Sequence, residues 1–121
     1  MADLNAIMAW TFTEEVAVPD EIKDLLIDGE VAEVAYKTIR DVAVVTNKRF
    51  IIADKQGLTG KKVEIYTIPF KSINMYSTEN AGRIDFNAEI ELWTKAGKLK
   101  FNLNKKVDVR KLDKIIANAI L

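Results

Sequence analysis

The chain has 121 residues, of which 49% are hydrophobic and 30% are charged, and its 18 basic residues balance 18 acidic ones. This length and composition predict one globular domain. The zero net charge argues against a dedicated nucleic-acid-binding protein, and a chain without cysteine or histidine offers neither disulfides nor the usual zinc ligands.

The start of the chain, MADLNAIMAW, has neither the basic region nor the long apolar stretch of a signal peptide. No apolar run approaches the roughly 20 residues that cross a bilayer, so we expect a cytoplasmic protein. The balanced charge hides a gradient: residues 1–35 carry nine acids and one base, whereas residues 94–114 carry eight bases and two acids. The two ends can neutralise each other within one fold, which we favour, or pair head to tail between copies.

Two short helices with an extended segment between them are expected near the N-terminus. Asp3 can cap the first helix, and Pro19 followed by two acids starts a second helix that ends at Gly29. Trp10 and Phe12 lie on the extended segment between these helices. Aromatic residues so close to an end can dock on the core of their own chain, or they can anchor on a neighbouring subunit.

The central part of the chain predicts a β-hairpin around which the fold is organised. The apolar runs Val42–Val45 and Phe50–Ala53 flank the corner Thr-Asn-Lys-Arg, and Asn47 is the corner residue that best tolerates a left-handed backbone. A further strand is expected within Val63–Phe70, after a polar loop.

The last third of the chain predicts two paired strands and a helix. Apolar residues alternate with polar ones along Ile84–Leu92, and the next strand, Leu99–Leu103, alternates with lysines, so acids and lysines should face each other on the outer side. Asp108 caps an amphipathic helix that should lie against the sheet. The expected order is two short N-terminal helices, about seven strands and one helix that plugs a closed or nearly closed barrel.

Two stretches, Thr46–Ile52 and Ile68–Ile73, carry a resemblance to a known family. With them, the chain from Pro19 to its end resembles the bacterial pleckstrin-homology (PH-like) domain family, which leaves residues 1–18 as an N-terminal extension and residues 19–121 as the domain. The resemblance implies a mainly β fold, a strongly bent seven-stranded antiparallel sheet capped by a C-terminal helix. It also implies ring-like homo-oligomers and a family without an assigned biochemical role.

The sequence offers no residues for an enzyme, a metal or a cofactor. Without histidine or cysteine, the common nucleophile–base pairs cannot be built. Glu89 and Glu91 share one strand face, which alternation places on the solvated side. The loop from Gly57 to Lys62 lacks the spacing of a phosphate-binding loop and leads to a strand rather than a helix.

Basic residues near the strand ends form a candidate anion site for an acidic lipid headgroup. Its members come from two loops that can share one end of the sheet: Lys37, Arg40, Lys55, Lys61 and Lys62. Lysine-rich loops are also common because they are solvated, and the nearby acids favour this explanation. The turn between Lys37 and Arg40 lacks the dense basic cluster of a phosphoinositide-binding loop.

We therefore predict a non-enzymatic interaction domain that associates with itself, with no nucleic acid as partner. Candidate contacts between copies are Trp10, Phe12, Glu14 and Glu15. A membrane-peripheral module that binds anionic headgroups through its lysine loops is the alternative hypothesis.

Overall fold

The computed structural model describes residues 8–56, 62–79 and 87–121. The described residues contain a short helix α1 (Asp20–Lys23), a 3-10 turn η1 (Phe70–Ser72) and a longer helix α2 (Val109–Ile120). They also form eight strands: β1 (Met8–Val16), β2 (Ala32–Thr38), β3 (Asp41–Thr46), β4 (Arg49–Gln56), β5 (Lys62–Pro69), β6 (Ile73–Glu79), β7 (Ala88–Thr94) and β8 (Gly97–Leu103).

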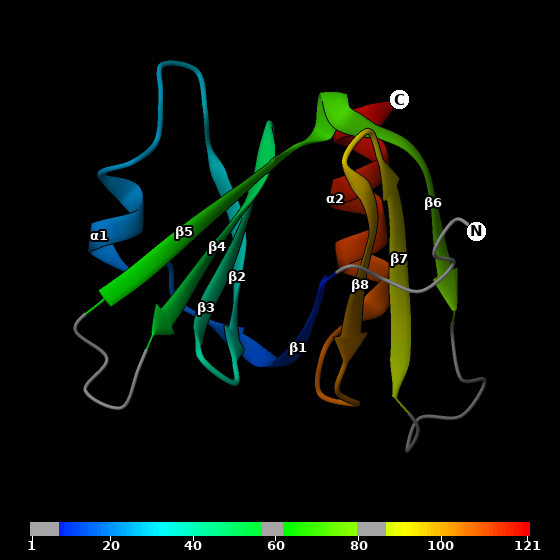
Figure 1. Ribbon diagram of the computed structural model, residues 1–121, viewed down its shortest axis with the longest axis horizontal. Helices are drawn as coiled ribbons and strands as arrows, with labels where there is room; N and C mark the ends of the chain where they lie inside the picture. The colour runs from blue at the N-terminus through cyan, green and yellow to red at the C-terminus, as the bar shows by residue number, and fades with distance from the viewer. Residues whose placement is uncertain (1–7, 57–61, 80–86) are drawn as a thin grey trace.

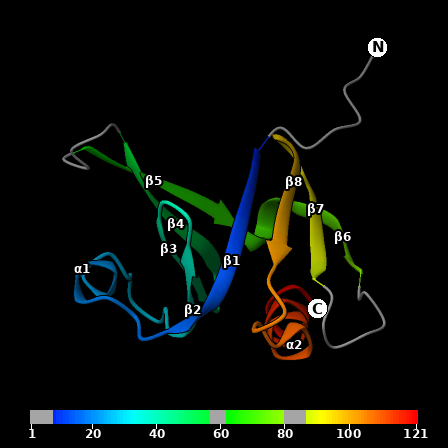
Figure 2. The ribbon, with the colours of Figure 1, turned by 90° about the horizontal axis from the view of Figure 1, so that it is seen from below.

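All eight strands belong to one sheet, which is bent so strongly that its two halves face each other (Figure 1). The strand order is β5-β4-β3-β2-β1-β8-β7-β6, with β1 and β8 parallel and the other neighbours antiparallel. Figure 2 shows β1 at the centre, where the two halves meet, and α2 beside the space between them. Strands β5 and β6 follow one another in the chain but lie at opposite edges, so the barrel stays open along a seam that η1 bridges at one end.

A strongly bent, PH-like sheet with a C-terminal helix was predicted and is confirmed, but the sheet has eight strands rather than seven. The additional strand is β1, which was expected only as an extended segment. Its alternating apolar side chains, Trp10 and Phe12, are followed by two glutamates and a register irregularity, so the sequence shows too short an alternation to indicate a strand.

Strand β1 also changes the expected division of the chain. Residues 8–16 were assigned to an N-terminal extension, yet they lie between β2 and β8 in the middle of the sheet. The first expected helix, capped by Asp3, was to reach Met8; residues 1–7 lie outside the described residues, and Met8 begins β1 instead. The second is shorter than predicted, since α1 ends at Lys23 and irregular turns follow as far as Gly29, which has a positive φ of 78°.

Two hydrophobic clusters lie on opposite faces of the first half of the sheet. The inner cluster fills the space between the halves and includes Phe12, Tyr36, Phe50 and Phe101, all fully buried. Phe12 stacks between Tyr36 and Phe101, with ring centroids 5.1 and 4.8 Å apart. The outer cluster packs the buried Ile22 of α1 against side chains of β2, β3 and β4.

Helix α2 closes the inner cluster, as predicted. Its N-cap is Asp108, whose Oδ1 accepts a hydrogen bond from the Lys111 backbone at 3.1 Å. Leu112 and Ile116 are fully buried against the sheet. Among the described residues, no helix is both long and apolar enough to cross a membrane.

Candidate functional site

The turn between β3 and β4 is tied to the segment after α1 by a buried ion pair. The Glu30 carboxylate is completely shielded from solvent. Arg49 donates to both of its oxygens, from Nε to Oε2 at 2.8 Å and from Nη2 to Oε1 at 3.0 Å, and the Thr46 hydroxyl donates to Oε2 at 2.7 Å. The Arg49 hydrogen bond is the main cause that lowers the pKa of Glu30 to about 2, although burial opposes it.

Asn47 completes this attachment with its side-chain amide. Its Oδ1 accepts a hydrogen bond from the Val31 backbone at 2.8 Å, and its Nδ2 donates to the Gly29 carbonyl at 3.0 Å. The expected left-handed backbone at Asn47 is wrong, since no described residue other than glycine has a positive φ. Thr46, Asn47 and Arg49 therefore hold the β3–β4 turn against the segment after α1. This is the structural role of the stretch Thr46–Ile52, the first of the two that carry the family resemblance.

The second stretch forms the corner that leads from β5 into β6. Pro69 precedes η1, and the Ser72 hydroxyl donates to the Pro69 carbonyl at 2.7 Å. Phe70 turns inward, with its ring 5.1 Å from that of Phe50, and its backbone N–H donates to the Lys48 carbonyl at 3.0 Å. This hydrogen bond fixes η1 against the β3–β4 turn.

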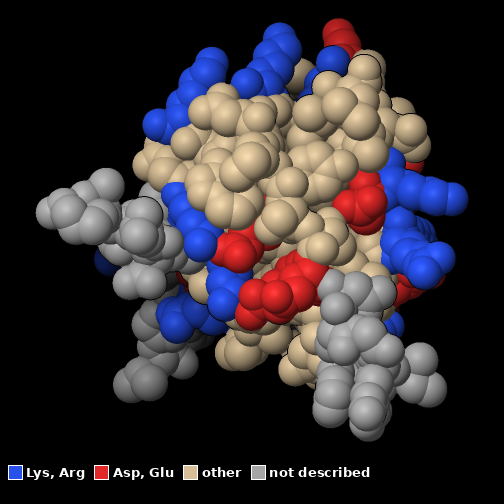
Figure 3. Space-filling model, turned by 90° about the vertical axis from the view of Figure 1, so that its right-hand side faces the viewer, with Lys and Arg blue, Asp and Glu red and all other residues tan. Residues whose placement is uncertain are grey.

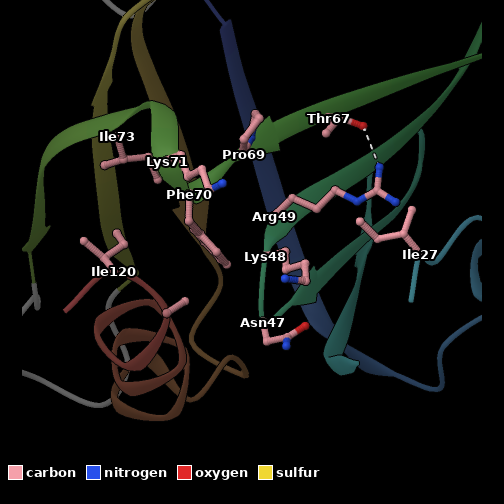
Figure 4. Close-up of a pocket in the computed structure, with 11 residues that line it drawn as sticks. Ile27, Asn47, Lys48, Arg49, Thr67, Pro69, Phe70, Lys71, Ile73 and Ile120 are labelled. Atoms are coloured by element: carbon pink, nitrogen blue, oxygen red, sulfur yellow. Dashed lines mark hydrogen bonds between the residues drawn. The ribbon is translucent and has the colours of Figure 1, made fainter. Parts of the chain in front are cut away.

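A pocket of about 720 Å³ lies at this end of the open seam, and we call it the seam pocket. Figure 4 shows Phe70, Ile73 and Ile120 on one side of it and Arg49 with Ile27 on the other. The remaining lining residues come from the β3–β4 turn, the end of β5, η1 and α2: Asn47, Lys48, Thr67, Pro69, Lys71 and Ala119. Its size is that of a small-molecule site.

The three cationic residues of the seam pocket differ in their partners. Arg49 is neutralised by Glu30 and also donates to Thr67 Oγ1 at 3.1 Å and to the Leu25 carbonyl at 3.0 Å. Lys48 and Lys71 are exposed and form no ion pair with any residue that the structure describes. The pocket therefore combines apolar walls with two ammonium groups that are available to a ligand.

The predicted anion site lies at the opposite end of the sheet. The structure brings Arg40 next to Lys55, whose carbonyl accepts hydrogen bonds from Nε and Nη2 at 3.1 and 2.8 Å. Arg40 is already paired with Asp54. Lys37 and Lys62 stand near the ends of β2 and β5, whereas Lys61 lies outside the described residues.

Acids balance the bases at that end. Asp54 lies opposite Asp41 on one neighbouring strand and opposite Glu64 on the other. The Tyr66 hydroxyl donates to Glu64 at 2.8 Å, which raises the pKa of Tyr66. The concentration of positive charge that a phosphate would require is thus partly cancelled.

The four candidate contacts between copies have different surroundings. Phe12 is fully buried, and Trp10 is 9% exposed, with its ring 5.6 Å from that of Tyr66. Both therefore dock on the core of their own chain, so they are not surface anchors in this conformation. Glu15 pairs with Lys111 of α2 at 2.9 Å, which joins the acidic start to the basic end within one molecule. Glu14 is exposed.

Ion pairs cover the outer face of β7 and β8, as the alternating sequence predicts. Lys100 pairs with Glu89 at 2.9 Å, and Lys98 pairs with Glu91. The Glu89 hydrogen bond raises the pKa of Lys100. On the face that Figure 3 shows, acidic side chains lie across the middle, and basic ones project from the upper end and the right-hand side. Both glutamates form ion pairs with lysines of the neighbouring strand, diagonal to them in the register, which explains them without catalysis.

The sequence did not predict the seam pocket. Its lining comes from four segments that are distant in the chain, and its two available lysines lie in different segments rather than in one cluster of the sequence. The motif Ile68–Ile73, which contains Lys71, was recognised as a family feature but not as part of a cavity. No arrangement of three or more acidic residues that could hold a metal ion occurs in the part of the chain that the structure describes.

Comparison with known proteins shows which family and which proteins this chain is similar to. A family model described as "Bacterial PH domain" matches residues 3–120. An uncharacterised protein of Bacillus subtilis, YjqA, is 47% identical over 83 residues, which cover 69% of this chain and 66% of that protein, just under two thirds of its length. A second uncharacterised Bacillus subtilis protein, YozO, is 28% identical over 79% of this chain and 83% of its own.

Solved structures are similar over most of the chain. A DUF1696-family protein with a pleckstrin-homology domain from Shewanella loihica has a TM-score of 0.80 and 41% identity, covering 89% of this chain and 97% of its own. A pleckstrin-homology domain from Shewanella amazonensis has a TM-score of 0.66 and 41% identity, with 84% of each chain covered.

Proposed function

The chain belongs to the bacterial PH domain family, and on this basis we propose that it is a non-enzymatic interaction domain that associates with further copies of itself. The observation that carries the proposal is the open seam. Strands β5 and β6 are edges of one sheet, each with a side that no described strand pairs. Such edges are templates for pairing with another chain.

The side chains of β5 make this edge suitable for a protein partner. Val63 and Ile65 are 47% and 41% exposed, although both are branched apolar residues. Leu25, which follows α1 in the chain, is 42% exposed. Association would remove these side chains from water and pair the backbone groups of the edge, and both changes favour assembly.

Charges that remain after pairing within the molecule supply a second contribution. Several acids near α1 and β2 have no ion pair with a described residue: Glu14, Glu21, Asp24 and Glu33. The same is true of bases around the start of α2: Lys105, Lys106, Arg110 and Lys114. Opposite charge on two regions of one surface favours head-to-tail contact between copies, which closes into a ring when the rotation between neighbours allows it.

Light scattering coupled to size-exclusion chromatography tests the proposal directly. The purified chain at tens of micromolar should elute with the mass of an oligomer. A strict monomer at that concentration would refute self-association.

A charge variant tests the electrostatic part separately. Replacing Glu14, Glu21 and Asp24 by their amides should shift the mass distribution toward the monomer, and the shift should grow at low salt, where charge attraction is screened least. The matched control, Glu89→Gln with Glu91→Gln, removes acids already paired within the molecule and should leave the mass unchanged.

The headgroup hypothesis for the lysine loops finds less support, because Arg40 is committed to Asp54 and acids surround the other bases. Co-sedimentation with anionic liposomes at low and physiological salt remains its test.

A further inference from the structure

We propose that the seam pocket binds a small amphiphilic anion, a carboxylate or phosphate head on an unbranched aliphatic chain. This goes beyond self-association and uses other residues. The pocket lies at the end of the seam, whereas the acids and bases invoked for assembly lie near α1 and at the start of α2.

The walls of the pocket suit an aliphatic chain. Phe70 and Ile73 are largely buried in the inner cluster, at 5% and 8% exposure, and together with Ile120 of α2 they present apolar surface to the cavity (Figure 4). Ile27 faces them from the segment after α1 and is 60% exposed. A bound chain would shield these groups from water, and the burial of apolar surface favours binding.

Two lysines at the pocket suit an anionic head. Lys48 enters from the β3–β4 turn and Lys71 from η1, and neither has an anionic partner among the residues that the structure describes. Arg49 lies on the Ile27 side of the pocket, and Glu30 neutralises it. A ligand head with a negative charge would therefore meet two ammonium groups whose charge the protein does not cancel.

The segments that carry these lysines are held in place before any ligand arrives. The Phe70 N–H donates to the Lys48 carbonyl at 3.0 Å, so the β3–β4 turn and η1 are joined directly. The buried Glu30–Arg49 pair fixes the turn from the other side. Such rigidity lowers the entropic cost of binding, since only the lysine side chains have to become ordered.

A purely structural role for the lysines is the competing explanation. The pocket lies at the C-terminal end of α2, where the helix dipole is negative and favours nearby cations. If this were their whole purpose, replacing them would lower the melting temperature without changing the affinity for an anion. The experiment therefore measures both quantities.

Dodecanoate below its micellar concentration is the probe, titrated into the ¹⁵N-labelled chain and followed by chemical shifts. Saturable shifts at submillimolar ligand should appear at the amides of Lys48, Phe70, Lys71 and Ile73. The double variant Lys48→Gln, Lys71→Gln should bind about tenfold or more weakly, because two charge-assisted contacts are lost. The conservative variant Lys48→Arg, Lys71→Arg should retain the affinity within about threefold.

A control with the same change in net charge is available at the other end of the sheet. Lys55→Gln with Lys62→Gln removes two exposed lysines that do not line the pocket and should leave the dissociation constant unchanged. If the variant Lys48→Gln, Lys71→Gln does not fold, a competition experiment on the natural chain tests whether binding needs a negatively charged head. In it, the nonionic octyl glucoside competes with bound dodecanoate. The glucoside should fail to displace the bound anion.

Three outcomes would overturn the proposal. Equal affinity of the natural chain and the folded glutamine variant would remove the role of the lysines. Binding of inorganic phosphate as tight as that of dodecanoate would remove the role of the apolar walls. Binding to vesicles of phosphatidylglycerol, with no shifts from monomeric dodecanoate, would assign the site to a membrane surface instead. The oligomeric mass of the Lys48→Gln, Lys71→Gln variant is measured as well. If this variant loses dodecanoate binding but keeps the oligomeric mass, ligand binding and self-association are independent properties.

Discussion

The two halves of the sheet are built from similar strands but differ in how many of their faces are buried. Strands β2, β3 and β4 have the inner cluster on one face and the outer cluster, covered by α1, on the other. Strands β7 and β8 bury only their inner face, and their outer face carries the pairs Glu89–Lys100 and Glu91–Lys98. A strand that is buried on both faces has a continuous run of apolar residues, whereas a strand with one solvated face alternates between apolar and polar residues.

The same difference separates the ion pairs of the two halves. The Glu30 carboxylate has no contact with solvent, and it accepts hydrogen bonds from the Ile27 backbone, the Thr46 hydroxyl and the Arg49 guanidinium. Glu91 and Lys98 are about one quarter exposed. A buried charge that loses its partner is costly, whereas a solvated one is rehydrated. The energetic consequences of breaking each pair should therefore differ severalfold.

Removing the buried carboxylate should have the largest effect. Glu30→Ala leaves Arg49 without a counter-charge and cuts the link between the β3–β4 turn and the segment after α1, so we expect a loss of about 3–5 kcal/mol in the free energy of unfolding. Urea unfolding followed by far-UV circular dichroism measures it. Glu91→Ala is the matched control and should cost less than about 1 kcal/mol. Similar losses for both variants would contradict the distinction between the halves.

Truncating a side chain of the outer cluster should have the next largest effect. Ile51 is fully buried on the face of β4 that α1 covers, so Ile51→Ala should cost about 2–5 kcal/mol through lost burial and the cavity left behind. Met75, on β6 in the other half, is 56% exposed, and Met75→Ala should change stability by less than about 0.5 kcal/mol. The comparison uses the same urea measurement. A small effect at Ile51 would mean that the outer cluster contributes little to stability.

Acid should weaken the buried pair in a defined pH window. The folded pKa of Glu30 is about 2, below its ordinary 4.5, so its stabilisation is complete above about pH 4.5 and is lost as pH falls toward 2. The difference corresponds to about 3 kcal/mol at most. The stability gap between the natural chain and Glu30→Gln, measured by urea unfolding at several pH values, should narrow as pH falls from about 5 to 2. A gap that stays constant across this window would show that the carboxylate charge is not what stabilises the turn.

Much of the fold could be predicted because its patterns are local. The runs around Val44 and Ile51, the alternation toward Leu92 and the cap at Asp108 each indicate their element within a few residues. Strand β1 could not be recognised in the same way. It is held between β2 and β8 by neighbours that are distant in the chain, and this contact overrides its weak local pattern.

The candidate site was less predictable, for a related reason. Sequence patterns gather lysines that are close in the chain, such as Lys55 and Lys62, but a pocket gathers residues that are close in space. The backbone hydrogen bond from Phe70 to Lys48 joins the two segments that carry Lys48 and Lys71, and no periodicity shows such a contact. The same limitation applies to Glu30, whose partner Arg49 is nineteen residues away.

The smallest expected change in stability comes from breaking the partly exposed pair Glu91–Lys98 on the second half of the sheet. A double-mutant cycle with Glu91→Gln and Lys98→Gln should give a coupling energy of about 0.2–1 kcal/mol, since both partners remain partly hydrated. The ammonium of Lys98 also lies 5.3 Å from the Trp93 ring centroid, and this favourable contact persists when the carboxylate is lost. The coupling should fall further in high salt, whereas the corresponding cycle for Glu30 and Arg49 should hardly respond, because their contact is shielded from mobile ions. Equal salt dependence of the two cycles would mean that the segment after α1 does not shield the Glu30–Arg49 pair from solvent.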